Sequence, residues 1–334
     1  MKPELDDSFF AEIETMKSKQ GASGVSTLWH NGAHWKVAAV GECMIEITER
    51  QGAGISYGFA GDTLNTAVYL AREFSDSGHQ VDYVTAVGDD PFSQQMLAQW
   101  AEEGVGTGLV TVIPGEQPGL YWVRTDNRGE RNFFYWRKET AAQKLMEATR
   151  AFSLAEQLSE YDLVYLSGIT LAILGPDSRE LLLAMLAQLR RAGVRIAFDT
   201  NYRPKLWPSR NEARNWLSRL AGTCQVALVS FDDEQAVFDD ETPADSVARL
   251  RGEGVEEIIV KNGSKPCLAA TAAEQLEIPL QQQVTQVDTT AAGDSFNAGY
   301  INARVRGLSL TEAVNHAQQL AAKVVQFPGA VIPR

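Results

Sequence analysis

The amino-acid sequence predicts an α/β fold, with a mostly parallel central sheet flanked by helices and a small β-sheet inserted as a lid. Two observations predict the body of this fold. Short apolar segments alternate with amphipathic helical segments along much of the chain. Several apolar segments also end in polar residues and a turn, which is typical of parallel strands. A third observation predicts the lid, because a section rich in aromatic residues, 109–137, interrupts this alternation.

Composition and charge limit the class of protein. The chain has 334 residues, of which 44% are hydrophobic and 22% are charged, and this is ordinary for a globular protein with one large domain. The formal net charge is −13 and no basic stripe is present, so neither nucleic acid nor an anionic membrane is an expected partner. An acidic protein that binds an anionic ligand must gather its cations at the site. Arginines near a predicted site of this chain are therefore stronger evidence for an anionic ligand.

Cysteine usage indicates a reducing compartment. The three cysteines lack the number and spacing of a disulfide framework or a zinc site: Cys43, Cys224 and Cys267. No apolar run is long enough to span a membrane, and the N-terminus lacks the apolar core of a signal peptide. We therefore expect a cytoplasmic protein.

The N-terminal part of the chain predicts an extension, a strand and a helix. Residues 1–35 are mixed and polar, and we expect an extension of unknown role, either a poorly ordered tail or an interaction arm. Residues 36–42 form a short apolar run that is typical of a buried strand. Apolar residues recur at helical spacing over 64–74, with Asp62 as the expected N-cap. The next strand and helix are expected at 81–87 and 91–103.

The predicted lid comprises segments 44–58 and 109–137. Aromatic strands are expected at 120–124 and 131–137, around a turn at 126–129. The inner face of the lid is expected to carry Tyr121, Tyr135 and Arg137. An alternative stays open, in which these aromatic residues pack the lid against the body or against the second subunit of a homodimer.

Three apolar strands in the C-terminal half end in polar tips. The strands are expected at 194–198, 226–229 and 258–260. The tips that follow them are 199–204, 230–234 and 261–263. Ligands of parallel α/β sheets bind at the carboxyl ends of the strands, so we expect these tips to lie along one edge.

Residues 288–296 carry the strongest chemical signal and read Asp-Thr-Thr-Ala-Ala-Gly-Asp-Ser-Phe. Three small residues precede an acid and an apolar helical run. The first free N–H groups of a helix form an anion site, and Asp294 would stand beside it as a proton acceptor. Phosphoryl transfer to an alcohol needs this combination. An acid in a first helical turn is also favoured by the macrodipole alone, so the interpretation needs support from the rest of the chain.

These motifs, in this order, resemble the ribokinase (PfkB) family of sugar kinases, and within it the branch that acts on 2-keto-3-deoxygluconate. The resemblance implies a ribokinase-like kinase domain over 36–334. The family signature Asp-Thr-x-Gly-Ala-Gly-Asp implies that Asp294 is the catalytic base and that Ala291, Ala292 and Gly293 bind phosphate. Ala291 departs from the family's glycine, which is tolerable if its backbone angles are ordinary. The motif is specific when it follows a strand and opens a helix, as we expect here.

The resemblance also implies a sugar pocket. In the family, the segment that matches Gly61, Asp62 and Asn65 holds the sugar hydroxyls. The residues implied to line the acid-sugar part of the pocket are Tyr121, Tyr135, Arg137 and Arg203. A guanidinium fork matches a carboxylate, so two arginines favour an acid sugar over a neutral one.

ATP with Mg²⁺ is the implied phosphoryl donor, with K⁺ as an additional cation in some relatives. The implied nucleotide contacts outside the signature are Asn201, Ser230, Lys261 and Gly263. Glu234 is implied to organise water around Mg²⁺, although Phe231 stands where many members carry asparagine. Asp288 is implied either as a ligand of K⁺ or as an acid that stabilises a turn.

The implied reaction is ATP-dependent phosphorylation of the 6-hydroxyl of 2-keto-3-deoxygluconate. Two alternatives stay open: a sibling kinase for a neutral sugar such as fructose or ribose, and a non-catalytic sugar-binding protein on the same fold. A dinucleotide-binding oxidoreductase is not expected, because no Gly-x-Gly-x-x-Gly motif follows the first strand.

Overall fold

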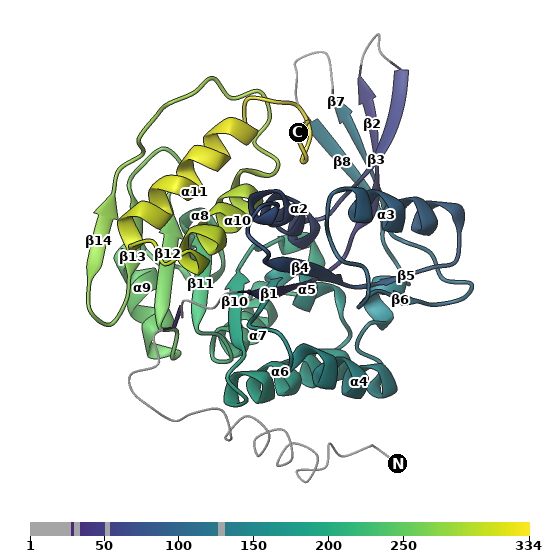
Figure 1. Cartoon of the computed structure of the whole chain (residues 1–334), viewed down its shortest axis with the longest axis horizontal. Helices are drawn as coiled ribbons and strands as arrows, with labels where there is room; N and C mark the ends of the chain where they lie inside the picture. Colours follow the sequence, from purple (N-terminus) through teal and green to yellow (C-terminus); the bar gives the residue numbers. More distant parts are fainter. Residues whose placement is uncertain (1–27, 30–33, 51–53, 126–130) are drawn as a thin grey trace.

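The computed structural model describes residues 28–29, 34–50, 54–125 and 131–334. Its largest sheet has eight strands within these ranges (Figure 1). Their spatial order is β14 (Gln275–Ile278), β13 (Cys267–Ala270), β12 (Glu257–Lys261), β11 (Val226–Ser230), β10 (Arg195–Asp199), β9 (Leu163–Ser167), β1 (Lys36–Val40) and β4 (Gln80–Val84). The strands from β12 to β4 run parallel, whereas β13 and β14 are antiparallel. The prediction of a mostly parallel sheet is confirmed.

Helices cover both faces of this sheet because its central strands are apolar on both sides. In β1, Val37 and Ala39 belong to one buried cluster, while Ala38 and Val40 belong to the other. The helices packed on the first cluster are α2 (Asp62–Phe74), α3 (Pro91–Glu102), α10 (Ala292–Val305) and α11 (Leu310–Val324). Those on the second are α4 (Ala148–Leu158), α5 (Gly168–Ile173), α6 (Pro176–Arg191), α7 (Arg210–Ala221), α8 (Phe231–Phe238) and α9 (Pro243–Gly252). Successive side chains of a strand alternate between faces, so the central strands contribute to both cores.

A second sheet projects from the body and forms the predicted lid (Figure 1). Its strands, in spatial order, are β3 (Gly54–Ala60), β2 (Met44–Arg50), β7 (Leu120–Thr125) and β8 (Arg131–Trp136). The antiparallel pairing of β7 with β8 confirms the predicted aromatic hairpin. The predicted turn at 126–129 lies outside the described residues.

The predicted strand at 81–87 is wrong as a single strand. β4 ends at Val84, and β5 (Ala86–Val87) pairs instead with β6 (Thr111–Val112) in a separate small sheet. The chain changes partner at Thr85, whose carbonyl oxygen accepts a hydrogen bond from the Thr111 amide at 2.9 Å. As a result, residues 109–119 lie outside the lid sheet, whose second segment begins at Leu120.

The N-terminal segment is described only at residues 28 and 29 before position 34. Trp29 is buried, and its indole N–H donates to Glu257 Oε1 at 2.8 Å. Residues 1–27 and 30–33 lie outside the described ranges, so the role of the extension is not tested. Within the described ranges, no helix combines the length and apolar character needed to cross a membrane.

Candidate active site

The tips of three parallel strands meet at one edge of the central sheet, as predicted. Asp199 ends β10, Ser230 ends β11 and Lys261 ends β12. Ser230 and Lys261 lie directly opposite each other in the strand register. Asp199 in turn lies opposite Ser167, the last residue of β9. The sheet therefore presents a row of polar side chains where parallel α/β folds bind ligands.

The N-terminus of α10 faces the Lys261 tip. A Cβ placed on Gly293 would lie 3.5 Å from Lys261 Nζ. Ala291 caps the helix with φ −111° and ψ 25°, outside the left-handed region that favours glycine. The alanine in place of the family's glycine is therefore unstrained. Ala291, Ala292 and Gly293 form the start of a helix whose free N–H groups and dipole favour an anion.

The expectation that this stretch directly follows a strand is wrong. β14 ends at Ile278, and a long loop leads from there to α10. The loop is anchored elsewhere: the amide of Val287 donates to the carbonyl of Val325 at 2.7 Å. Asp288 accepts from the Thr290 hydroxyl at 2.5 Å and from the Gly329 amide at 2.9 Å. These contacts agree with a turn-stabilising acid, and a K⁺ role for Asp288 stays a prediction.

Asp294 lies in the first turn of α10 and is almost fully buried, at 8% exposure. Its carboxylate accepts a hydrogen bond from Asn65 Nδ2 at 2.8 Å. Its backbone carbonyl accepts one from the Thr66 hydroxyl at 3.2 Å. Both donors lie in the first turns of α2, which thus holds the predicted base in position. Asn65, predicted as a sugar contact, directs its amide group at the base in this structure.

The pKa of Asp294 is raised well above the ordinary value of a carboxyl group. Burial is the largest cause, and the nearby carboxylate of Asp62 adds to it. The hydrogen bond from Asn65 acts in the opposite direction; the Asp199 carboxylate raises the pKa further and Lys261 lowers it. A carboxylate whose pKa lies closer to neutrality is a better proton acceptor for catalysis near pH 7. The chain thus places a buried carboxylate with a raised pKa in the first turn of α10.

The prediction that Asp62 is the N-cap of α2 is wrong, because Gly61 occupies that position. A Cβ on Gly61 would lie 2.1 Å from the carbonyl oxygen of Glu42, so only glycine fits where the two backbones meet. Asp62 instead accepts a hydrogen bond from Asn201 Nδ2 at 2.6 Å. Asn201 has φ 35°, an unusual value for a residue other than glycine. This contact joins the tip of β10 to the start of α2.

A buried polar network beneath these residues includes two side chains that the sequence reasoning missed, Asn297 and Tyr165. Lys261 Nζ lies 2.7 Å from Asp199 Oδ2 and donates to Asn297 Oδ1 at 3.0 Å. Asn297 Nδ2 lies within hydrogen-bonding distance of Asp199 Oδ2, at 2.8 Å, and of the Tyr165 hydroxyl, at 2.9 Å. Asn297 stands three residues after Asp294, a spacing that places both on one helix face and could have indicated it.

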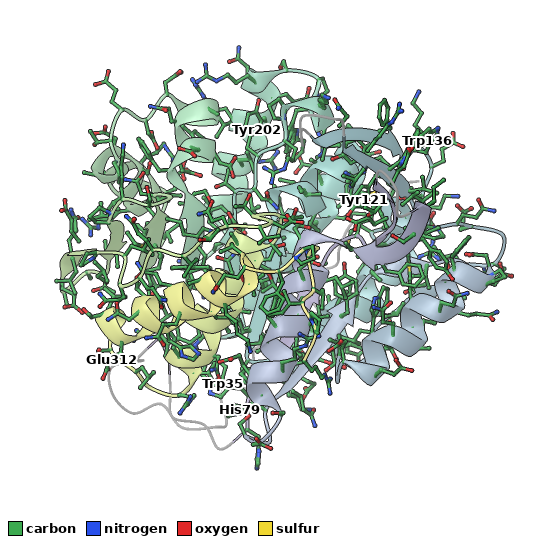
Figure 2. All side chains as sticks on the ribbon, turned by 90° about the horizontal axis from the view of Figure 1, so that it is seen from above. Trp35, His79, Tyr121, Trp136, Tyr202 and Glu312 are labelled. Carbon is green, nitrogen blue, oxygen red and sulfur yellow. The ribbon has the colours of Figure 1, made fainter. Side chains whose placement is uncertain are left out.

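The lid sheet carries the two predicted sugar-pocket tyrosines on one face. Tyr121 and Tyr135 lie opposite each other in the strand register, with ring centroids 5.8 Å apart. The Tyr121 hydroxyl donates to Glu46, and burial together with this carboxylate raises the pKa of Tyr121. Figure 2 shows Tyr121 in the lid and Tyr202, which follows the β10 tip, on the body.

Each of the two predicted arginines has a carboxylate partner within the chain. Arg137, which follows β8, forms a buried ion pair with Glu42. Arg203 is half exposed and lies 3.7 Å from Asp233. Its guanidinium also donates to the carbonyl of Tyr202 at 2.9 Å. An acid sugar would therefore meet arginines that already have partners.

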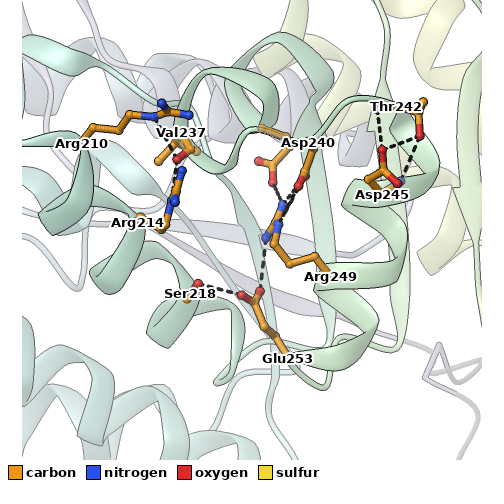
Figure 3. Close-up of polar contacts among 10 residues, drawn as sticks. Arg210, Arg214, Ser218, Val237, Asp240, Thr242, Asp245, Arg249 and Glu253 are labelled. Atoms are coloured by element: carbon orange, nitrogen blue, oxygen red, sulfur yellow. Dashed lines mark hydrogen bonds and ion pairs between the residues drawn. The ribbon is translucent and has the colours of Figure 1, made fainter.

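Glu234, the predicted organiser of metal-bound water, is fully buried and pairs with Arg249. Burial raises the pKa of Glu234 to about 7. Figure 3 shows that Arg249 also contacts Asp240 and Glu253, which ties α8 to α9. The metal role of Glu234 stays a prediction. Its neighbour Asp233 has its pKa raised to about 6 by burial and by the Asp199 carboxylate.

Two further nucleotide predictions concern the strand tips. Ser230 is the N-cap of α8, and Gly263 lies in the turn after β12 with φ 57°. A turn with positive φ at this place suits glycine and leaves open space above it. Among the described residues, no group of three or more His, Cys, Asp or Glu side chains is placed to hold a metal ion.

The fold and this site define a sugar-kinase arrangement, and the chain belongs to the pfkB family of carbohydrate kinases, whose family model matches residues 35–334. The 2-dehydro-3-deoxygluconokinase of Escherichia coli strain K12 is 44% identical over 302 residues, covering 90% of this chain and 97% of the relative. The enzyme of the same name from Dickeya dadantii is also 44% identical, covering 89% of this chain and 96% of the relative.

Solved structures agree with the fold. A provisionally named ribokinase II from E. coli, in complex with ATP and Mg²⁺, has a TM-score of 0.76 and 24% identity. The match covers 89% of this chain and 94% of the chain in the solved structure. The prediction of a ribokinase-like α/β fold with a small separate sheet is confirmed.

Proposed function

We propose that this chain transfers the γ-phosphoryl group of ATP to the 6-hydroxyl of 2-dehydro-3-deoxygluconate, named above as 2-keto-3-deoxygluconate. The products are 2-keto-3-deoxy-6-phosphogluconate and ADP. The observation that carries the proposal is the buried carboxylate of Asp294 beside the free N-terminus of α10, held there by Asn65. The sugar is chosen because relatives of that name cover nearly the whole chain at 44% identity.

Asp294 acts as the general base in this reaction. Its carboxylate takes the proton from the 6-hydroxyl as that oxygen attacks the γ-phosphorus, and the bond to the bridging oxygen of ADP breaks in line. The N–H groups at the start of α10 and the ammonium of Lys261 face the transferring group and stabilise its charge. Asn65 keeps the carboxylate oriented toward the acceptor.

Mg²⁺ would arrive with the nucleotide and neutralise charge on its phosphates. A magnesium ion bound through phosphates and water needs only one or two protein carboxylates. Asp199 and Asp233 suit this role, because they are close enough for the charge of Asp199 to raise the pKa of Asp233. The ammonium of Lys261 lies 2.7 Å from Asp199 Oδ2 and balances part of the negative charge there.

The acid-sugar carboxylate is assigned to the two arginines, and the hydroxyls to the start of α2. Arg137 reaches the pocket from the lid and Arg203 from the β10 tip. Gly61 approaches the backbone of Glu42, the partner of Arg137, and Asp62 binds Asn201, which lies two residues before Arg203. Tyr121 and Tyr135 would pack on the sugar from the lid.

We further propose that two copies associate through the outer face of the lid. That face has a hollow of about 440 Å³ lined by Ile47, Ile55, Leu120, Trp122 and Trp136. Ile55 and Trp136 are 72% and 57% exposed, and contiguous apolar exposure of this kind marks interaction sites. A cytoplasmic location is also proposed, on the basis of cysteine usage. The described cysteines are all buried and free.

A panel of sugars tests the proposed reaction directly. The purified protein is supplied with ATP, Mg²⁺ and one sugar at a time, and ADP release is measured for 2-dehydro-3-deoxygluconate, fructose and ribose. We expect kcat/KM to be at least about a hundredfold higher for the acid sugar, because two guanidinium contacts are lost with a neutral one. A preference for fructose or ribose would support the sibling-kinase alternative. Sugar binding without ADP release would support the non-catalytic one.

A further inference from the structure

The contact between Glu42 and Arg137 joins the lid to the central sheet. Glu42 lies two residues after β1, and its side chain is 1% exposed. Its carboxylate accepts hydrogen bonds from Arg137 Nη2 and, at 2.7 Å, from the Thr140 hydroxyl. Both donors lie in the short segment that follows β8. One buried carboxylate therefore holds the end of the lid hairpin.

Glu42 also lies at the wall of the proposed sugar pocket. Its carbonyl oxygen is the atom that a Cβ on Gly61 would strike, so its backbone touches the start of α2. One turn further along that helix, Asn65 binds the carboxylate of Asp294. The pair of Glu42 and Arg137 is therefore connected to the base through a single helical turn.

The guanidinium of Arg137 is only partly used by this pair. Its Nη2 binds Glu42, whereas its Nε is shielded from solvent and has no hydrogen-bond partner among the described residues. A guanidinium that binds a carboxylate in the bidentate mode offers two N–H groups. A buried donor without an acceptor is unfavourable. Arg137 thus retains capacity for a second acceptor.

We propose that Glu42 stands in for the substrate carboxylate on Arg137, and so sets how strongly the site prefers acid sugars over neutral ones. This inference rests on the proposed function, because it takes Arg137 as a group that binds the sugar carboxylate. The pair with Glu42 spares Arg137 the cost of a buried, unpaired charge. When an acid sugar binds, two carboxylates share one guanidinium and repel each other, which weakens binding. Glu42 acts through Arg137 and is a positioning residue.

The substitution Glu42→Gln tests this, because it removes the charge and preserves the size of the side chain. We expect the KM for 2-dehydro-3-deoxygluconate to fall about three- to tenfold, with kcat unchanged, because Arg137 becomes fully available. Calorimetric titration of the same sugar without nucleotide should show tighter binding by the same factor. The KM for fructose should not change. A merely structural role of Glu42 would not lower the KM for one class of sugar alone.

Two controls isolate the effect. Glu116→Gln alters another carboxylate near the base of the lid, one that pairs with Lys144 at 2.5 Å, and should leave acid-sugar binding unchanged. In an Arg137→Gln background, Glu42→Gln should no longer tighten binding, because the guanidinium that both carboxylates need is absent.

Unchanged or weaker acid-sugar binding by a folded Glu42→Gln variant would overturn the inference and leave the proposed function intact. Thermal unfolding checks the fold. If that variant does not fold, Glu42→Asp retracts the carboxylate by one methylene and carries the same test, with tighter acid-sugar binding expected and unchanged or weaker binding overturning it. If the wild-type protein binds no acid sugar by calorimetry, the proposed function fails, and the inference with it.

Discussion

The strand-tip site pairs its polar side chains with one another, whereas the lid sheet leaves large apolar side chains exposed to solvent. At the strand tips, Asp199, Lys261 and Asn297 bind one another; Asp199 and Asn297 are buried, and Lys261 is partly buried. The lid presents Trp136 and Ile55 to solvent, at 57% and 72% exposure, on the face opposite Tyr121. The strand-tip site, where we propose that the chemistry occurs, is thus held together by its own hydrogen bonds, whereas the lid leaves surface for contacts with other molecules.

The two faces of the lid differ for a simple geometric reason. Side chains of a strand alternate between faces, so Leu120 and Trp122 lie on one side of β7 and Tyr121 on the other. The same alternation separates Trp136 from Tyr135 in β8. The sequence left two alternatives for these aromatic residues: a sugar pocket, or packing of the lid against the body or a second subunit. Because side chains alternate along a pleated strand, one face of the lid can line a sugar pocket while the opposite face forms a subunit interface.

We therefore expect the body to determine the reaction, and the lid to determine the sugar preference and the assembly. The separation is not complete, because Arg137 and Glu42 connect the two regions. Substitutions in the body should therefore act on kcat. Substitutions in the lid should act on KM or on oligomeric state.

The largest effect is expected in the body, for Asp294→Asn. Loss of the general base should lower kcat by about a hundredfold to ten-thousandfold, with little change in sugar affinity. Steady-state ADP release and calorimetry measure the two quantities. The matched control is Asp232→Asn, which alters an exposed acid in the first turn of α8 and should leave kcat unchanged. If Asp294→Asn retained near-wild-type turnover, Asp294 would be a helix-terminal acid only.

The next effect is expected at the inner face of the lid, for Arg137→Ala. A charged hydrogen bond contributes about 1.5–3 kcal/mol, so the KM for the acid sugar should rise roughly ten- to a hundredfold with a smaller change in kcat. The melting temperature should also fall, because Glu42 loses its counter-ion. Arg124→Ala alters an exposed lid arginine and serves as control. If Arg137→Ala had the same KM for the acid sugar as the Arg124→Ala control, Arg137 would not belong to the sugar pocket.

A third effect concerns the outer face of the lid. Trp136→Glu places a charge in the apolar hollow and should weaken a lid-mediated dimer at least about tenfold, with kcat nearly unchanged. Light scattering across a concentration series measures this. Val112→Glu changes an exposed apolar residue outside the lid sheet and should have no effect. A wild-type protein that is monomeric at all concentrations would contradict the proposed interface.

The smallest effect is a shift in pH dependence within the body. Asp294 must be ionised to accept a proton, so kcat/KM should fall as the pH is lowered through its raised pKa. Asp62→Asn removes the neighbouring charge that raises this pKa, and the acidic limb of the profile should move to lower pH. Asp177→Asn, at an exposed position of α6, should leave the limb in place. If the acidic limb of the pH profile did not move in Asp62→Asn, Asp62 would not influence the pKa of Asp294.

Several features could be read from the sequence because they depend on local order along the chain. The apolar runs before Asp199, Ser230 and Lys261 predicted parallel strands, and parallel strands place their tips at one edge. The small residues before Asp294 predicted a helix start. The strand at 81–87 failed because the exchange of partner at Thr85 depends on β6, which follows more than twenty residues later.

Spacing and residue type reflect nearest neighbours along the chain, and they predicted the parallel strands, the aromatic hairpin and the helix start at Asp294. They could not predict which side chains meet in the folded protein. Asn65 binds Asp294 across 229 positions, and Arg137 reaches Glu42 across 95. Such contacts arise from the packing of whole elements and leave no periodic trace in the sequence. The raised pKa of Asp294 and the ion pair of Arg137 are therefore properties of the folded chain.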